Sequence, residues 1–200
     1  MQFQQNERHA VFLLSDTAAY MLSPAANLWY NMRIISRKAG PSMAETIKTN
    51  VMRILDREGV PHRVHFYDPE KGIDGLSVAR QLGQDPQSVF KTLVTQGKSR
   101  AFYVFVIPVG ATLSLKRAAA ACGEKAIEMI PQKILLPTTG YIHGGCSPIG
   151  MKKAFPTYID ETAQLFDTLC VSAGKIGAQV ELAPDALLAL TGAKYAELTD

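Results

Sequence analysis

The stretch from residue 140 to residue 150, Gly-Tyr-Ile-His-Gly-Gly-Cys-Ser-Pro-Ile-Gly, has the residue types of a ligand-binding loop. Gly144 and Gly145 can adopt backbone angles that other residues avoid, and they let a ligand approach the main chain closely. Successive N–H groups in such a loop can hold an anion or a polarised carbonyl oxygen. A tight turn between strands would have a similar composition, so the loop indicates oxyanion stabilisation or a turn equally well. It is not a phosphate P-loop, because no Gly-Lys-Ser/Thr follows.

Lys91 is the first candidate for a functional cation. It stands in a segment, residues 89–94, whose other members are mostly apolar. A lysine on a strand usually extends into solvent, which is the alternative interpretation. A lysine that faces a cavity instead places positive charge beside a phosphate or a developing oxyanion.

A second loop of small residues, Ser-Ala-Gly-Lys-Ile-Gly over residues 172–177, directly follows a predicted strand. Binding residues are commonly found in such loops. Ser172 and Gly174 are therefore candidates for a binding wall. The alternative is a hairpin turn with a solvated Lys175.

No nucleophile with a recognisable base is present. Cys146 lies in the glycine loop, but its neighbours form no cysteine-hydrolase signature, so a space-filling role is favoured. His143 borders the same loop, where a histidine satisfied by water is the favoured interpretation. No Gly-X-Ser-X-Gly motif occurs, and the histidines and cysteines show no metal-ligand spacing. We therefore predict neither a metal nor a cofactor.

These residues must be positioned by a fold that mixes helices and strands. The periodicity and the glycine and proline stops predict a first helix that is capped by Thr46 or Thr49 and ends at Glu58. They also predict helices over residues 74–82, 115–122 and 184–190 and a helical turn that begins at Pro131. They predict strands over residues 63–67, 89–94, 101–107, 126–130, 157–160, 168–172 and 179–182. The unbroken apolar run over residues 101–107 is typical of a central strand covered on both faces. Because helices and strands do not strictly alternate, an α+β domain is favoured over a doubly wound one.

Composition limits the classes of protein that need to be considered. The chain has 200 residues, 47% of them hydrophobic and 20% charged, and a formal net charge of +3. This mild charge, without a Lys/Arg block, disfavours a large DNA-binding surface. The lack of a long apolar run disfavours a membrane span. Three separated cysteines without a CxxC pair are typical of a cytoplasmic protein.

Residues 1–42 differ from the rest of the chain because their apolar residues show no clear period. A signal peptide or a mitochondrial presequence fits poorly, since acidic residues interrupt the segment. We predict an N-terminal extension that is poorly ordered or results from an upstream start site. The functional domain is predicted to span residues 43–200.

Five segments, in order, resemble the YbaK/EbsC family of free-standing aminoacyl-tRNA editing proteins, which are related to the editing insertion of bacterial prolyl-tRNA synthetases. They are Val89-Phe-Lys-Thr-Leu93, Leu113-Ser-Leu-Lys-Arg117, the loop from Thr139 to Gly150, Thr157-Tyr-Ile-Asp160 and the loop from Ser172 to Gly177. The resemblance covers residues 46–200 and is greatest for the Cys-tRNA(Pro) deacylase branch. It implies an α+β fold with a mixed, curved, partly barrel-like sheet surrounded by helices.

The resemblance also implies roles for individual residues. It assigns catalytic roles to Lys91, Gly144 and Gly145, and substrate-binding roles to Tyr67, Ser147, Asp160, Ser172 and Gly174. The sequence departs from the family at Cys146, where an aliphatic residue is usual, and at Ala173, where a second glycine is usual. The first departure leaves the loop backbone untouched, whereas the second weakens the case for close ligand approach at that wall.

The implied activity is the clearing of mischarged Cys-tRNA(Pro), and of Cys-tRNA(Cys), without a cofactor. The substrate's own thiolate would attack the ester carbonyl, with loop N–H groups on the oxyanion and Lys91 near the terminal adenosine. The enzyme would be a hydrolase, or a lyase if the thiol cyclises. The implied partners are the acceptor end of mischarged tRNA and prolyl-tRNA synthetase. Two alternatives remain: deacylation of another substrate such as Ala-tRNA(Pro) by water, and a non-catalytic module that binds tRNA or a synthetase.

Overall fold

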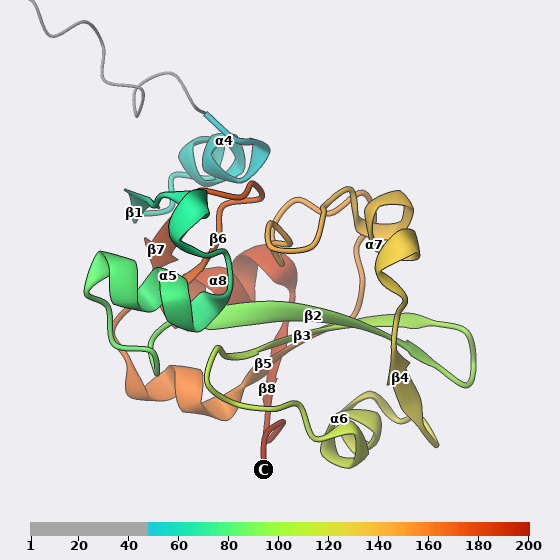
Figure 1. Cartoon of the computed structure of the whole chain (residues 1–200). Helices are drawn as coiled ribbons and strands as arrows, with labels where there is room; N and C mark the ends of the chain where they lie inside the picture. The colour runs from blue at the N-terminus through green and yellow to red at the C-terminus, as the bar shows by residue number, and fades with distance from the viewer. Residues whose placement is uncertain (1–47) are drawn as a thin grey trace, which may run out of the picture. The chain divides into compact units, whose positions relative to one another are not determined.

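A computed structural model describes residues 48–200, so the predicted extension over residues 1–42 and the predicted domain start at residue 43 lie outside the described residues. The described part contains helices and strands in mixed order (Figure 1). Its helices are α4 (Asn50–Arg57), α5 (Gly75–Leu82), α6 (Leu115–Cys122), α7 (Gln132–Thr139), α8 (Pro184–Thr191) and the 3-10 helices η1 (Pro69–Lys71) and η2 (Glu161–Leu165). Its strands are β1 (His62–Phe66), β2 (Phe90–Gly97), β3 (Phe102–Pro108), β4 (Ile127–Met129), β5 (Thr157–Asp160), β6 (Leu169–Ser172), β7 (Ala178–Leu182) and β8 (Lys194–Ala196). The predicted α+β class is confirmed.

The strands form two sheets. One is three-stranded and antiparallel, in the order β1-β7-β6. The other has the order β4-β2-β3-β5-β8, antiparallel from β4 to β3 and parallel from β3 to β8. The mixed sheet is as expected, but both described sheets keep open edges and do not close into a barrel. They meet where Val89 bridges to Cys170, whose N–H donates to the Ser88 carbonyl at 2.9 Å.

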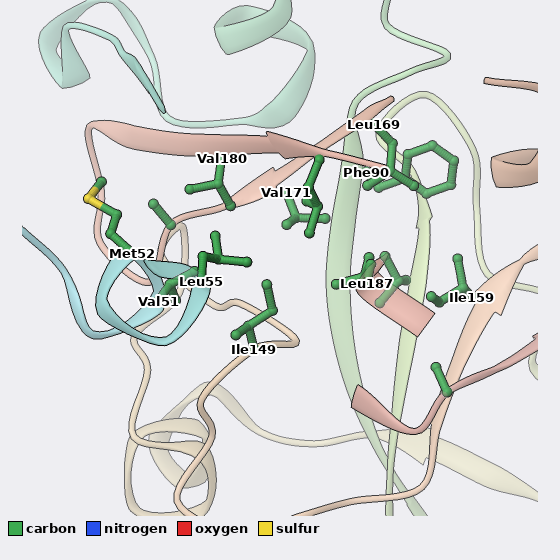
Figure 2. Close-up of a cluster of buried hydrophobic side chains, with 14 of the residues drawn as sticks. Val51, Met52, Leu55, Phe90, Ile149, Ile159, Leu169, Val171, Val180 and Leu187 are labelled. Atoms are coloured by element: carbon green, nitrogen blue, oxygen red, sulfur yellow. The ribbon is translucent and has the colours of Figure 1, made fainter. Parts of the chain in front are cut away.

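β3 lies in the middle of the five-stranded sheet, as its apolar run predicts. Side chains alternate along a strand, so β3 contributes to two cores. Phe105 packs with Ala118 of α6 on one face, and Val106 packs in the core on the other face. The second core also holds the inner face of the three-stranded sheet (Figure 2). The side chains labelled there are Val51, Met52, Leu55, Phe90, Ile149, Ile159, Leu169, Val171, Val180 and Leu187.

Helix α4 begins at the second of the two predicted caps, Thr49. The Thr49 hydroxyl accepts a hydrogen bond from the Met52 N–H at 3.3 Å, and the Thr49 N–H donates to the Met52 sulfur at 3.4 Å. These contacts satisfy backbone donors that the first helical turn leaves free. Val51 and Leu55 are fully buried against the shared core.

Helix α5 places one wall of the site. Asp74 caps it by accepting from the Ser77 N–H at 3.0 Å, and Gly83 ends it in the left-handed conformation. Its first residue, Gly75, lies so close to Val109 that a Cβ there would come within 2.2 Å of a Val109 methyl carbon. Only glycine therefore lets the start of α5 approach the segment that follows β3.

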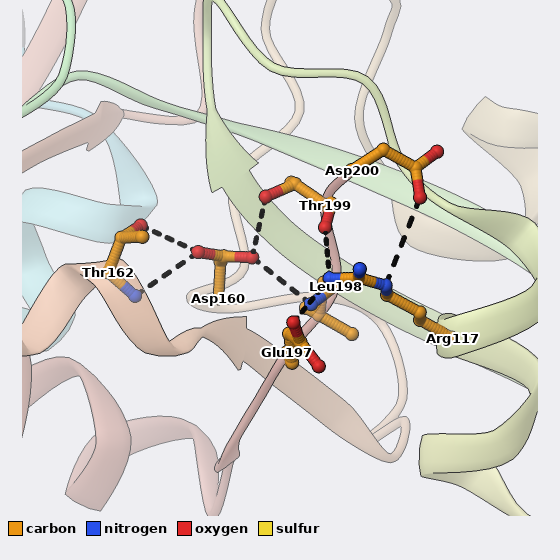
Figure 3. A network of polar contacts seen from close by, with 7 residues as sticks. All are labelled: Arg117, Asp160, Thr162, Glu197, Leu198, Thr199 and Asp200. Carbon is orange, nitrogen blue, oxygen red and sulfur yellow. Dashed lines mark hydrogen bonds and ion pairs between the residues drawn. The ribbon is translucent and has the colours of Figure 1, made fainter.

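Asp160 anchors the C-terminal strand of the five-stranded sheet (Figure 3). One carboxylate oxygen accepts from the Leu198 N–H at 3.2 Å and the Thr199 hydroxyl at 3.3 Å. The other accepts from the N–H and hydroxyl of Thr162 at 3.1 and 2.6 Å. Arg117 of α6 donates to the Thr199 carbonyl at 2.6 Å. The segment after α8 is thereby fixed beside β5, where it forms β8, a strand that the sequence pattern did not predict.

Every helix in the part of the chain that the structure describes is too short or too polar to span a bilayer.

Candidate active site

A cavity of about 310 Å³ lies between the start of β2, the first turn of α5, the glycine loop and the three-stranded sheet. This volume is within the range of small-molecule sites. The cavity brings together Tyr67, Lys91, Gly144 and Ser172 from the residues predicted for the site. The other predicted residues, Gly145, Ser147, Asp160 and Gly174, do not line it.

Lys91 faces this cavity rather than bulk solvent. Its half-buried ammonium group donates to the carbonyl oxygens of Val109 at 3.1 Å and Ala111 at 2.7 Å. Two acceptors leave one of the three ammonium donors without a partner among residues 48–200. No carboxylate of the described chain pairs with Lys91, and burial lowers the pKa of its side chain below the usual value. The result is a fixed positive charge with one donor available to a ligand.

The open edge of β2 adds main-chain groups to the same wall. β4 pairs only with Thr95–Gly97, and β6 bridges only to Val89 before the strand begins, so the middle of β2 has β3 on one side and no strand on the other. The Val89 carbonyl is bonded toward β3 and the Val94 carbonyl toward β4. Because these directions alternate along an antiparallel strand, the N–H and carbonyl of Thr92 point to the open edge.

The glycine loop supplies a smaller set of donors than the sequence predicts. Gly144 lines the cavity with a φ of 79°, and its N–H has no acceptor among the described residues. The Gly145 N–H is already committed to the Ile142 carbonyl at 3.1 Å, so it shapes the turn and is not free for an oxyanion. Ser147 is completely buried, and its hydroxyl accepts from the Ile149 N–H at 3.3 Å. Ser147 therefore braces the loop from behind.

In the second small-residue loop, residues 172–177, one predicted residue lines the cavity and the other does not. Ser172 lines the cavity, and its hydroxyl accepts from the Gly174 N–H at 3.2 Å, which leaves the hydroxyl proton for a ligand. Gly174 has a φ of 82°, and a Cβ there would lie 2.8 Å from the Tyr141 ring and 3.0 Å from a Val51 methyl carbon. Gly174 thus permits close packing behind the wall instead of contacting a ligand.

Asp160 is placed differently from the prediction. It is only 1% exposed, and both carboxylate oxygens accept the hydrogen bonds that hold Thr162 and the C-terminal strand. A carboxylate so fully engaged has little capacity left for a substrate. Its geometry assigns it to the architecture of the five-stranded sheet and not to the cavity.

Three polar side chains that line the cavity were not predicted as site residues: Asp74, Thr92 and Gln179. Gln179 of β7 and Thr92 of β2 both line the wall, and the Gln179 Oε1 and Thr92 Oγ1 atoms are buried without a hydrogen-bond partner in the described chain. Buried polar atoms are rarely left unpaired, so these two are candidates for ligand contacts. Strand register is the feature that would have identified Gln179 as a site residue, because it lies directly opposite Ser172 on the neighbouring strand.

The cavity holds no pair of side chains arranged for nucleophilic attack. Cys146 lines it, but burial raises the pKa of the thiol to about 12, so the group is neutral near pH 7. His143 also lines the cavity, and no hydrogen bond joins its ring to the described residues. The chemistry available is therefore stabilisation and positioning by a cation, hydroxyls and main-chain donors.

Comparison with known proteins identifies the family. Residues 75–190 match the family model of the aminoacyl-tRNA editing domain. The chain belongs to this family. It is also 50% identical, over 153 residues, to a protein of Enterococcus faecalis provisionally named as the Cys-tRNA(Pro)/Cys-tRNA(Cys) deacylase EbsC. That match covers 76% of this chain and 93% of the relative.

Solved structures support the same fold for this editing domain. A protein provisionally described as a trans-editing enzyme for prolyl-tRNA synthetase matches with a TM-score of 0.68 at 24% identity, over 77% of this chain and 99% of that chain. The hypothetical protein APE2540 matches with a TM-score of 0.69 at 21% identity, over 75% and 99% of the two chains. The predicted resemblance to the YbaK/EbsC family is confirmed.

Proposed function

We propose that this editing domain is a free-standing aminoacyl-tRNA deacylase that clears Cys-tRNA(Pro), and Cys-tRNA(Cys), with the substrate's own thiol as nucleophile. One observation carries the proposal. The cavity offers a fixed cation, Lys91, and unpaired donors, but no nucleophile with a base. A site of this kind can accelerate ester cleavage only if the attacking group arrives with the substrate or is water.

The reaction can be written with its atoms balanced. The substrate thiol first loses its proton to solvent. The thiolate then attacks the ester carbonyl, a C–S bond forms, and the bond between that carbon and the ribose oxygen breaks. The ribose oxygen takes a proton from solvent and leaves as the tRNA hydroxyl. Water opens the resulting cyclic thioester and gives free cysteine.

Each free donor of the cavity has a place in this scheme. The Gly144 N–H can donate to the carbonyl oxygen as it becomes negative during attack. The unpaired ammonium donor of Lys91 can hold the terminal adenosine. Thr92 and Gln179 can accept from ribose hydroxyls or the substrate's ammonium group, because their oxygens are unpaired. The protein thus orients the thiol toward the carbonyl, and orientation alone can supply much of the rate.

We expect the enzyme to select substrates by whether the attached amino acid carries a thiol, because the thiol is the proposed nucleophile. The tRNA(Pro) charged with cysteine should be deacylated, while the same tRNA charged with serine or alanine should not. Binding pockets distinguish side chains that differ this little by only about 10- to 200-fold. A ratio of kcat/KM above that range, measured on a panel of mischarged tRNAs, would come from the thiol and not from fit.

The same panel separates the alternatives. Efficient turnover of Ala-tRNA(Pro) contradicts thiol assistance and favours attack by water. Tight binding to every tRNA of the panel, without turnover of any, favours a non-catalytic module.

Replacing Cys146 with serine is expected to leave deacylation within a few-fold of wild type, because a neutral buried thiol supplies no nucleophile. Single-turnover kinetics with Cys-tRNA(Pro) measure this directly. An inactive C146S variant, together with a covalent adduct on the wild-type protein in mass spectra, would make Cys146 the nucleophile. The matched control is Cys122→Ser, whose half-buried thiol does not line the cavity.

The rim of the cavity suits the acceptor end of tRNA. Residues 131–159 include the glycine loop and contain Lys133, Lys152 and Lys153 but no aspartate or glutamate. All three lysines are exposed, and the Lys152 ammonium group donates to the Leu136 carbonyl of α7 at 3.3 Å. Because Leu135 of that helix lines the cavity, the Lys152 charge lies on an element that contributes to the cavity wall. Phosphates of the acceptor stem are the natural partners of such charge.

Replacing Lys153 with alanine is expected to raise KM for tRNA while kcat changes little. The slope of log KM against log salt should fall by about 0.7 to 0.9, the contribution of one phosphate contact. Lys116→Ala is the matched control, because this exposed lysine lies on α6, which does not line the cavity. An unchanged salt slope in the Lys153 variant would remove this residue from the tRNA contact.

We further propose that prolyl-tRNA synthetase is a partner and that the protein acts in the cytoplasm. The mild net charge of +3 suits a protein that holds only the acceptor end of a tRNA, so a synthetase that holds the rest would complement it. The three cysteines are free thiols, which fits a reducing compartment.

A further inference from the structure

A second polar cluster lies on the outer face of the three-stranded sheet. It consists of His65 on β1, Cys170 on β6 and Glu181 on β7. Cys170 and Glu181 are directly opposite each other on paired strands. His65 reaches the same place from the next strand, where its Nε2 lies 2.7 Å from a Glu181 carboxylate oxygen. One nitrogen, one sulfur and one oxygen atom thus lie within 4.8 Å of one another.

Gln84, in the loop after α5, supplies a fourth donor. Its amide nitrogen donates to the Cys170 sulfur at 3.3 Å, whereas its amide oxygen is buried without a partner among the described residues. A half-turn of the amide exchanges the two atoms and turns the unpaired oxygen toward the sulfur. The cluster then presents nitrogen, sulfur and two oxygens from four separate segments of the chain.

The remaining polar neighbours of the cluster contact Glu181, whose carboxylate is the negatively charged group of the cluster. The Thr168 hydroxyl donates to the second Glu181 oxygen at 2.8 Å, and Arg63 lies 4.0 Å from that same oxygen. These two groups hold the carboxylate so that its other oxygen faces His65. Cys170 is 4% exposed, and its sulfur has no polar contact in the described chain besides Gln84.

We propose that His65, Cys170 and Glu181 bind a zinc ion, with the amide oxygen of Gln84 as the fourth ligand. Imidazole nitrogen, thiolate sulfur and carboxylate oxygen are each zinc ligands in four-coordinate sites, while magnesium and calcium prefer oxygen donors only. As the sulfur–zinc bond forms, the thiol proton leaves to solvent. No ligand pair is close in sequence, so a search for motif spacing could not find this site.

The site has a direct structural relation to the cavity. Each of the three strand ligands is two residues from a residue that lines the cavity: His65 from Tyr67, Cys170 from Ser172, and Glu181 from Gln179. Residues two apart on a strand share a face. The ion would tie three strands and the loop after α5 together on the same face of the sheet, next to one wall of the cavity. Its role is to hold that wall, not to take part in the reaction.

Cobalt is the probe that tests this proposal. The full-length reduced protein, freed of metal by a chelator, is titrated with Co²⁺ and followed by absorption. We expect one equivalent to give the near-ultraviolet band of a cobalt–thiolate bond and intense visible bands of tetrahedral cobalt. Cys170→Ser should abolish the near-ultraviolet band, whereas the control Cys122→Ser should keep it.

A second measurement guards against misfolding of the Cys170 variant. His65→Gln removes one ligand at a half-buried position and leaves the thiol in place. We expect it to weaken Co²⁺ binding at least tenfold, and Zn²⁺ to raise the melting temperature of wild type but not of this variant. Absence of a thiolate band in wild type overturns the proposal. So does a band that persists in Cys170→Ser, or undiminished affinity in His65→Gln.

Discussion

The Lys91→Ala variant is expected to lose at least about a hundredfold in kcat/KM for Cys-tRNA(Pro), the usual cost of removing one positioned electrostatic donor. The ammonium group is held by two carbonyl oxygens in a cavity wall, so it is already oriented before substrate arrives. Alanine leaves the cavity without its fixed positive charge. Initial rates of deacylation at several tRNA concentrations measure the loss.

The fold should survive this change, because water can reach the half-buried carbonyls that the lysine leaves. Circular dichroism and thermal unfolding should therefore match wild type. Lys98→Ala is the control, since it removes an exposed lysine just after the same strand. Wild-type turnover by a correctly folded Lys91→Ala protein would remove this residue from the mechanism.

The Asp160→Ala variant is expected to lose about 3 kcal/mol of unfolding free energy, because several hydrogen-bond donors would be left without an acceptor. These are the N–H groups of Leu198 and Thr162 and the hydroxyls of Thr199 and Thr162. Urea denaturation measures the loss. Asp160→Asn should be less damaging, since its carbonyl oxygen can still accept part of the set.

Kinetics of the same variant separate the two interpretations of Asp160. If it is architectural, the activity of the folded fraction should stay near wild type. Full stability combined with lost activity would instead restore the substrate-binding role that the resemblance implies.

The sequence was informative wherever the signal was local. Lys91 stands out because it interrupts an apolar strand, and the structure places it in the cavity. The apolar run of β3 and the caps of α4 and α5 depend on neighbouring residues, so these elements could be predicted.

The missed features depend on partners that are distant in the sequence. The hydrogen bonds of Asp160 reach residues 38 and 39 positions away, so its architectural role becomes visible only in the fold. Gln179 enters the cavity wall through its register with Ser172, and strand register cannot be deduced from one strand alone. The donors of the glycine loop were overcounted because composition does not reveal which N–H groups the turn itself uses, as at Gly145.

The walls of the cavity come from both sheets, Lys91 and Thr92 from one and Ser172 and Gln179 from the other, across the bridge between Val89 and Cys170. The cavity is therefore complete, and the enzyme active, only when the two sheets pack against each other. Turnover can serve as a reporter of that packing during refolding: it should return with the slow burial of the shared core, after helical signals recover, and not in proportion to them.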